Sequence, residues 1–290
     1  MERRLFTFCR FAWGVLAYIL LVILWGAYVR ATGSGAGCGG HWPLCNGQIV
    51  PPSPGAATII EYAHRLTSGL SLVLVAALCA WAFRLFPPGH PVRCLATLSG
   101  LFLVLEALLG AGLVLLDYVA MNASAGRVVY LSAHFVNTQV LLGLLALTAV
   151  GRVRLTGGRV LLATLPVALL LSVSGVLAAL SDTLYPATSL QSGLQQELAP
   201  GAHSLLRLRL LHPAVAVAAG LFLLMAAMSA ARKNLSPARL VIVLLFVQMG
   251  AGFVNVLLLA PVWMQILHLL VADLLWIALV ILAAGQAKSS

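Results

Sequence analysis

Four histidines of this sequence lie inside long apolar segments, where an ionisable side chain is costly and usually functional. The chain has seven histidines, and three fall between such segments: His41, His90 and His203. The remaining four are His64, His134, His212 and His268. Imidazole is a ligand for haem iron, zinc and copper. These four residues are therefore the first candidates for a metal or redox site.

The segments that carry them are expected to be membrane helices. Hydrophobic residues make up 62% of the chain and charged residues 8%, whereas a soluble domain carries about 25% charged residues. Eight apolar runs approach the roughly 20 residues that a spanning helix needs: 11–29, 59–83, 94–117, 128–150, 160–180, 205–230, 239–260 and 262–285. They are continuous rather than alternating, which excludes a β-barrel. We predict an all-α polytopic membrane protein with eight transmembrane helices, the first too long for a cleaved signal segment.

Basic residues set the expected topology. With the N-terminus in the cytoplasm, twelve Lys and Arg residues fall inside, as the positive-inside rule requires: Arg3, Arg4, Arg10, Arg84, Arg93, Arg152, Arg154, Arg159, Arg232, Lys233, Arg239 and Lys288. Five fall at the outer side: Arg30, Arg65, Arg127, Arg207 and Arg209. The net charge of +10 is then mainly a topology signal rather than a nucleic-acid surface. We expect a multi-pass protein of a bacterial plasma membrane with both termini cytoplasmic.

The two halves of the chain, 1–150 and 151–290, echo each other. Gly-Ala-Gly occurs in the third run at 110–112 and in the seventh at 250–252. The four histidines fall in the second, fourth, sixth and eighth runs. Parallel repeats of this kind predict two pseudo-symmetric four-helix bundles.

The histidines share one predicted depth. Every even-numbered run enters from the outer side, and each histidine lies about six residues into its run, on the order of 10 Å deep. Imidazoles on facing helices can hold a haem iron in a bundle. Zinc or copper usually needs further ligands, and none is evident beside His212 or His268. We predict two haem sites, His64 with His134 and His212 with His268, and leave pairing across the halves open.

The two predicted sites differ in charge. Glu61 lies three residues before His64, one helical turn away, whereas Arg209 takes the matching place before His212. A carboxylate there could handle protons during a substrate oxidation, or it could form an i,i+4 ion pair with Arg65.

Other charged residues near the histidines have open roles. Arg65 and Arg209 could contact haem propionates or lipid phosphates, since both offer anionic oxygens. Glu106 and Asp273 could serve proton paths or hydrogen-bond to neighbouring helices, and the sequence does not choose between these roles.

Two of the five cysteines, Cys38 and Cys45, flank the first outer loop. They could form a structural disulfide or a redox-active pair, because reactivity depends on strain and thiol environment. Cys9, Cys79 and Cys94 are interpreted as inert small residues.

These residues together resemble the haem A synthase family of eight-helix membrane proteins. The resemblance covers nearly the whole chain. It is strongest in Tyr-Val-Arg-Ala-Thr-Gly-Ser-Gly at 28–35, Gly37-Cys38, Trp42-Pro-Leu-Cys45 and Glu61-x-x-His64-Arg65. The Cys-bearing loop combined with Glu-x-x-His-Arg is a specific pattern, whereas the second half alone would be weak.

The resemblance implies an oxidoreductase that converts the C8 methyl of haem O to a formyl group, giving haem A for terminal oxidases. It implies substrate haem O between His64 and His134 in 1–150, and a haem B cofactor between His212 and His268 in 151–290. Glu61 matches the catalytic carboxylate. Cys38 and Cys45 match the outer-loop pair, whose second copy is missing from 181–204 here. Implied partners are membrane lipid, a haem O synthase (protohaem farnesyltransferase), an electron donor and a second copy of the chain.

Three other functions fit parts of the pattern. A bis-histidine dihaem cytochrome that takes electrons from quinol would share the histidine frame. A thiol–disulfide oxidoreductase would use Cys38 and Cys45, although that class favours Cys-x-x-Cys. A haem transporter or chaperone would bind haem without turnover.

Overall fold

The computed structural model describes residues 2–151, 158–232 and 237–285, and these residues form helices and loops without a strand. Eight helices are long and apolar enough to cross a membrane, which confirms the predicted all-α class. They are α1 (Glu2–Ala31), α2 (Ala56–Leu85), α3 (Pro91–Leu115), α4 (Ala125–Val150), α5 (Arg159–Leu184), α7 (Ser204–Arg232), α8 (Pro237–Leu257) and α9 (Val262–Ala284). Two short elements join them: η1 (Ser34–Ala36) and α6 (Leu190–Leu198).

Local signals explain where several helices begin and end. The His90 side chain accepts a hydrogen bond from the Val92 N–H at the start of α3, and Pro91 occupies the first turn, where its missing N–H costs nothing. Ser124 caps α4 through the Arg127 N–H. Gly151 ends α4 with φ 68°, a left-handed conformation that glycine adopts without strain.

One expectation about the outer segment between the fifth and sixth spanning helices was wrong. Residues 181–204 are expected to be a loop, but α5 continues to Leu184 and α6 occupies Leu190–Leu198. A capping box starts α6, because Ser189 and Ser192 each accept from the other's backbone N–H. The segment is too polar to register as an apolar run, so hydropathy alone misses it.

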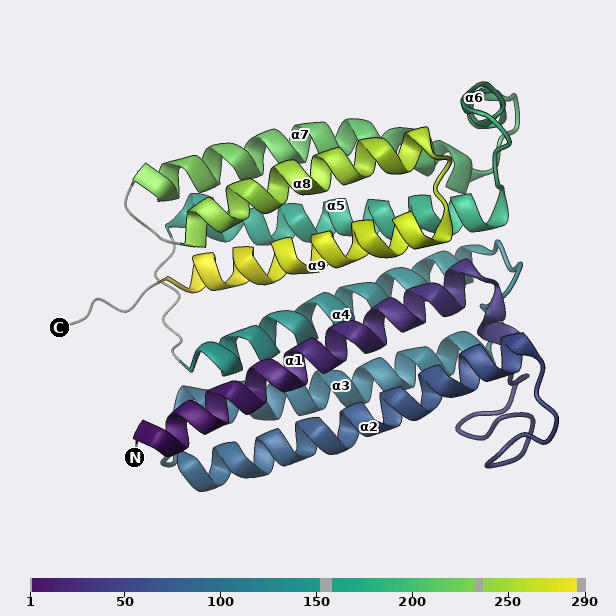
Figure 1. Cartoon of the computed structure of the whole chain (residues 1–290). Helices are drawn as coiled ribbons and strands as arrows, with labels where there is room; N and C mark the ends of the chain where they lie inside the picture. The colour runs from purple at the N-terminus through teal and green to yellow at the C-terminus, as the bar shows by residue number, and fades with distance from the viewer. Residues whose placement is uncertain (1, 152–157, 233–236, 286–290) are drawn as a thin grey trace.

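The helices of each half contact one another in a closed ring. In the first half α1 contacts α2, α2 contacts α3, α3 contacts α4 and α4 contacts α1. In the second half the same order runs through α5, α7, α8 and α9. Figure 1 shows these two groups as separate layers. The helices α2 and α4 therefore occupy opposite corners of one ring, and α7 and α9 opposite corners of the other. Pseudo-symmetry itself stays a prediction, supported by this shared order.

The two rings meet through α1 and α4 on one side and α5 and α9 on the other. Buried leucines of the two helices belong to one hydrophobic cluster: Leu141, Leu142 and Leu145 from α4, with Leu279 and Leu282 from α9. More than half of the most apolar window is buried in α4 and in α9, against at most 28% in the other spanning helices. These two helices are thus the central pair.

Polar contacts also cross the boundary. Arg30 of α1 donates to the Ala179 carbonyl and the Thr183 hydroxyl of α5, both at 2.8 Å, and to Gln265 Oε1 of α9 at 3.0 Å. Deeper in the molecule, Gln139 Nε2 donates to Asp273 Oδ1 at 2.8 Å. For Asp273 the structure shows a hydrogen bond to a neighbouring helix, one of the two roles left open by the sequence.

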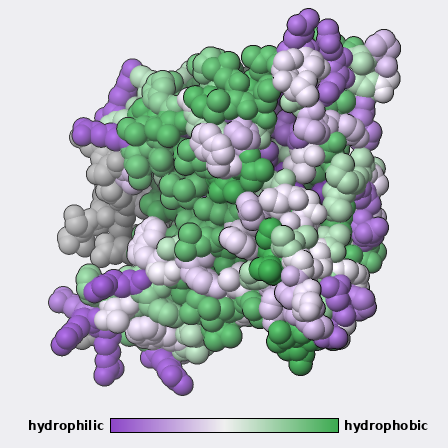
Figure 2. All heavy atoms as spheres, turned by 45° about the vertical axis from the view of Figure 1, so that its right-hand side comes forward, coloured by the Kyte–Doolittle hydropathy of each residue, from purple (hydrophilic) through white to green (hydrophobic). Residues whose placement is uncertain are grey.

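The start of α1 and the end of α9 lie at one end of the molecule, and the Cys38–Cys45 loop and α6 lie at the other (Figure 1). We call the second the loop end. Twelve basic residues are expected on the cytoplasmic side. Eight of them are in the described ranges, and these lie toward the first end. The other four, Arg152, Arg154, Lys233 and Lys288, are not in the described ranges. Figure 2 shows hydrophobic residues over the middle of the visible face and hydrophilic groups at both ends. The chain is a multi-pass membrane protein.

Candidate functional site: two histidine pairs near the loop end

The four membrane histidines lie at closely similar depths. His64, His134, His212 and His268 follow the first residues of α2, α4, α7 and α9 by 8, 9, 8 and 6 positions (64−56, 134−125, 212−204, 268−262). At 1.5 Å per residue these offsets correspond to about 9–14 Å below the loop end. Because α2 and α4 are opposite corners of one ring, and α7 and α9 of the other, each half places one histidine on each side of its own bundle.

Each histidine ring packs against a glycine of a neighbouring helix. A Cβ on that glycine would lie 3.0–3.7 Å from the ring Cε1, and most of these distances are too short for an ordinary contact. At His64, His212 and His268 a Cβ would therefore push the imidazole by a few tenths of an ångström, whereas at His134 it would make an ordinary contact. The pairs are Gly26 of α1 with His64, Gly110 of α3 with His134, Gly175 of α5 with His212, and Gly252 of α8 with His268.

Three of the four rings keep a buried nitrogen without a hydrogen-bond partner among the described residues: Nδ1 of His64, His134 and His268. The fourth, His212 Nδ1, lies 2.8 Å from the Ser174 hydroxyl. A buried polar atom left unpaired costs about 1–3 kcal/mol. Imidazoles held in this state are suited to accept a ligand that fixes their orientation.

Glu61 is buried one turn before His64 and is held by two partners. Its Oε2 accepts the Cys38 N–H at 2.7 Å, and its Oε1 accepts Arg65 Nε at 3.1 Å and Nη2 at 2.5 Å. The i,i+4 ion pair considered from the sequence is therefore present. Arg65 also donates from Nη1 to the carbonyls of His41 and Leu44, both at 2.5 Å. The guanidinium joins the carboxylate to the outer loop.

The outer loop is closed by a disulfide between Cys38 and Cys45. Both cysteines are buried, at 0% and 1% exposed. The loop lies directly on α2, since a Cβ on Gly37 would come within 2.4 Å of the Ala57 backbone. This burial limits access by an external thiol and favours a structural role, while a redox role stays an alternative prediction.

The corresponding place in the second half holds an arginine with carboxylate partners. Arg209 Nε donates to Glu197 Oε1 of α6 at 2.6 Å, and Nη1 donates to Asp182 Oδ1 at 3.3 Å and to the Tyr185 carbonyl at 2.9 Å. Its Nη2 is buried with no partner in the described part of the chain. Arg209 thus keeps one donor for an anionic group. Contact of Arg65 or Arg209 with propionates stays a prediction.

Glu106 lies beside the other histidine of the first half. Its Oε1 is 3.4 Å from His134 Nδ1 and accepts a short hydrogen bond from the Thr138 hydroxyl. Its Oε2 accepts Asn137 Nδ2 at 2.6 Å. The structure therefore shows Glu106 joining α3 to α4 by hydrogen bonds, one of the two roles considered from the sequence.

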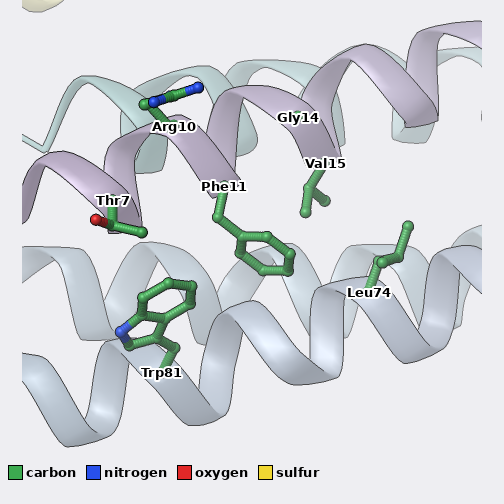
Figure 3. A pocket seen from close by; sticks show the side chains of 7 residues that line it. All are labelled: Thr7, Arg10, Phe11, Gly14, Val15, Leu74 and Trp81. Carbon is green, nitrogen blue, oxygen red and sulfur yellow. The ribbon is translucent and has the colours of Figure 1, made fainter. Parts of the chain in front are cut away.

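A groove of about 450 Å³ lies elsewhere (Figure 3). It runs between α1 and α2, where the Phe11 and Trp81 rings lie 5.4 Å apart, and Leu74 marks its near edge. Leu74 is ten residues beyond His64 along α2, or about 15 Å deeper. This groove is not part of the histidine site.

Comparison with known proteins identifies the family. Residues 9–280 match the family COX15-CtaA, described as cytochrome oxidase assembly protein. The chain belongs to this family, the haem A synthase family. A "Heme A synthase" of Bacillus cereus (strain AH187) is 49% identical over 96 residues, 33% of this chain and 31% of the relative. A Bacillus anthracis (strain CDC 684 / NRRL 3495) protein of that name matches equally.

Two matches that cover more of the chain have a different name. A "Protoheme IX farnesyltransferase" of Thermus thermophilus is 48% identical over 289 residues, 95% of this chain but 48% of the relative. A second strain of Thermus thermophilus has a protein of the same name with the same coverage. The chain therefore spans about half the length of these Thermus relatives. What their names say about activity applies to those whole proteins.

The histidine site of this haem A synthase family member fits haem as a ligand. A porphyrin already provides the equatorial ligands, so iron needs only two axial groups from the protein, and each ring of helices offers two imidazoles. Within residues 2–151, 158–232 and 237–285, no group of three His, Cys, Asp or Glu residues could hold a bare metal ion. The facing glycines pack against the imidazoles without placing a side chain on the rings.

Sequence reasoning missed two of the four glycines, Gly26 and Gly175. The Gly-Ala-Gly segments are visible in the sequence, but it does not show what they contact. The first glycine of one segment, Gly110, and the last glycine of the other, Gly252, are the ones that face a histidine. A depth comparison could have found all four, because each lies 5–9 residues before the last residue of its helix (31−26, 115−110, 184−175, 257−252). That depth matches the depth of the histidines.

Proposed function

We propose that this chain is a haem A synthase, an oxidoreductase that converts the C8 methyl of haem O to a formyl group. Membership of the family and the names of the Bacillus relatives support the role in haem A synthesis. The observation that carries the specific reaction is the buried Glu61, fixed one turn before His64 and matched by an arginine in the other half. Only one half has a carboxylate in this place.

His64 and His134 are assigned to the substrate haem O, and His212 and His268 to a resident haem B. Bound haem supplies the redox chemistry, and the protein supplies orientation and electrostatics. The histidines of each half lie on helices at opposite corners of one ring, so a haem would be held between them. At their shared depth its propionates would be near the loop end, and the apolar bundle would take a farnesyl tail.

Glu61 is assigned as the catalytic carboxylate. Successive two-electron oxidations of a methyl group release protons, and a positioned carboxylate can accept them. Arg65 and the Cys38 N–H hold both oxygens of Glu61 in place, so the carboxylate keeps one orientation while substrate binds. The Arg65 contacts to the loop carbonyls join the acid to the loop end of the molecule.

The proposal extends to partners and orientation. Haem O would come from a protohaem farnesyltransferase, and the Thermus relatives with that name are about twice as long as the region they share with this chain. A separate electron donor would serve the haem B half. We place the loop end on the outer face of a bacterial plasma membrane, because the basic residues concentrate at the opposite end.

Haem extraction tests the proposed function directly. The purified protein, produced together with a source of haem O, would be extracted, and its haems separated by chromatography and identified by mass. Haem A or its hydroxylated precursor beside haem B is expected. Haem B alone, with added haem O unchanged under aerobic reducing conditions, would overturn the proposal and favour the dihaem electron-transfer cytochrome.

A further inference from the structure

The histidines of α4 and α9 see equivalent neighbours from α3 and α8. The helices α3 and α4 contact each other, as do α8 and α9. In each pair the histidine ring packs on one glycine, Gly110 against His134 and Gly252 against His268. These two glycines therefore provide a structural alignment of α3 with α8 that does not depend on sequence similarity.

This alignment shows a difference in charge. Four residues before Gly110 stands Glu106, and four residues before Gly252 stands Gln248, each one turn away on the same face of its helix. Glu106 Oε1 is 3.4 Å from His134 Nδ1. Gln248 Nε2 is 3.2 Å from His268 Nε2. The two side chains lie beside opposite ring nitrogens, Nδ1 of His134 and Nε2 of His268, and only the first half uses an anion.

The carboxylate is held by a pair of side chains that the second half lacks. Asn137 and Thr138, three and four residues after His134, donate to the two oxygens of Glu106. The positions three and four residues after His268 are Val271 and Ala272, which cannot donate. Asn137 is further fixed by its bond to the Phe102 carbonyl at 2.9 Å. The acid and its two supports thus form one unit, built only in the first half.

We propose that Glu106 is a positioning residue that sets a negative charge against His134, so that haem held by His64 and His134 has a lower reduction potential than haem held by His212 and His268. The inference rests on the proposed haem-binding role of these histidines. A carboxylate beside the distal nitrogen of a ligating imidazole fixes the ring orientation and raises the basicity of the ligand. A more basic axial ligand and a nearby negative charge both stabilise ferric over ferrous iron.

The consequence is an order of reduction for the two haems. Each haem is an ordinary one-electron centre, and the centre with the higher potential holds the electron at equilibrium. The second half, with Arg209 and Gln248 in the matching places, would therefore be reduced first, which suits a half served by a separate electron donor. The haem of the first half would be reduced last.

The test is a spectroscopic redox titration of the purified protein with both haems bound. The variants His64→Ala and His212→Ala assign the two components to their halves. In Glu106→Gln, which keeps the shape and an acceptor for Thr138, the ferrous-to-ferric ratio of the first-half component at fixed potential should rise about tenfold, or about 59 mV for one electron. The second-half component should stay unchanged. Gln248→Glu should shift the second-half component downward instead.

Thr138→Val is the matched control, since it removes one support but keeps the charge. An equal shift in Thr138→Val and Glu106→Gln would mean that packing, rather than charge, sets the potential, and the inference would fail. An unshifted first-half component in Glu106→Gln would also overturn it. Should Glu106→Gln not accumulate with haem, an unshifted second-half component in Gln248→Glu would be decisive against the proposal. If Glu106→Gln shifts the potential as expected but the wild-type protein makes no haem A, that result would count against the proposed synthase reaction alone.

Discussion

The two halves of this protein attach an outer segment to a histidine-bearing helix by opposite charges. In the first half the helix contributes the carboxylate Glu61, which accepts from the loop N–H of Cys38 and from Arg65. In the second half the helix contributes Arg209, which donates to Glu197 of α6 and to Asp182 of α5. The helix arrangement is shared, but one half keeps an acid one turn before His64 and the other keeps a cation one turn before His212.

This difference makes the position of Glu61 suited to proton transfer and the position of Arg209 suited only to binding anionic groups. A carboxylate near a reacting carbon can accept protons, whereas a guanidinium stays protonated and can only donate hydrogen bonds. The same contrast recurs at the second histidine of each half, where Glu106 and Gln248 take matching places. Both anionic positions belong to the first half. The comparison can be tested at four levels.

The largest effect should come from removing an axial histidine. We expect His212→Ala to lose the haem of the second half, and His64→Ala that of the first, so that bound haem falls by about half in each because bis-histidine ligation needs both imidazoles. A pyridine haemochrome assay after purification measures this. If both variants lost the same haem type, the assignment of one pair to each half would be wrong.

Glu61→Gln should abolish turnover while leaving haem binding intact. Loss of a general base typically lowers a rate by about 10²–10⁴-fold, so haem A should fall at least about a hundredfold. Asp117→Asn is a matched control, because Asp117 is exposed near the loop end, outside the pocket, with φ 55°, which asparagine tolerates. Chromatography of extracted haems gives the readout. Normal haem A output from Glu61→Gln would remove this carboxylate from the mechanism.

Leucine at a facing glycine should displace the imidazole and weaken haem binding in that half alone. Gly26→Leu meets the His64 ring, where even a Cβ would lie 3.0 Å from Cε1, whereas a Cβ at Gly14 on the same helix has no neighbour within 4 Å. We expect haem affinity of the first half to fall about tenfold in Gly26→Leu, as for other residues that orient a ligand, and to stay unchanged in Gly14→Leu.

Haem titration of the depleted protein measures the affinity of each half. Gly175→Leu with the control Gly250→Leu repeats the design in the second half, since a Cβ at Gly250 also has no neighbour within 4 Å. Equal losses in a test variant and its control would show that the glycines serve helix packing in general rather than the histidines.

The sequence predicts the spanning helices and the position of four histidines within them, because apolar runs and the polar residues inside them are local features. The Glu61–Arg65 ion pair is one of the two roles that the sequence suggests for Glu61, and the structure shows it. The contacts of Gly26, Gly175 and Arg30 do not follow from the sequence, since they depend on which helices are neighbours in space. Helix α6 was missed because a polar, capped helix of nine residues leaves no hydropathy signal. The histidine assignments and the roles of Glu61 and the arginines remain predictions.

The smallest expected effect on activity is that of removing the disulfide. The second half, whose outer segment 185–203 has no cysteine, shows why. That segment is held by Arg209 and its two carboxylate partners. An ion-pair network is therefore sufficient to attach an outer segment to its helix. The first half already has a comparable network through Arg65, Glu61 and the loop carbonyls, so its disulfide should add stability rather than chemistry.

We expect Cys38→Ala combined with Cys45→Ala to lower stability by about 2–3 kcal/mol, the contribution of closing a short loop, while haem A output per bound haem falls only a few-fold. Thermal unfolding in detergent and haem extraction at low temperature measure the two effects separately. Arg65→Gln on the double variant should then release the loop and cost far more activity, because no covalent link remains. A loss of turnover in the cysteine variant as deep as in Glu61→Gln, at unchanged stability, would contradict this and establish a redox role for the pair.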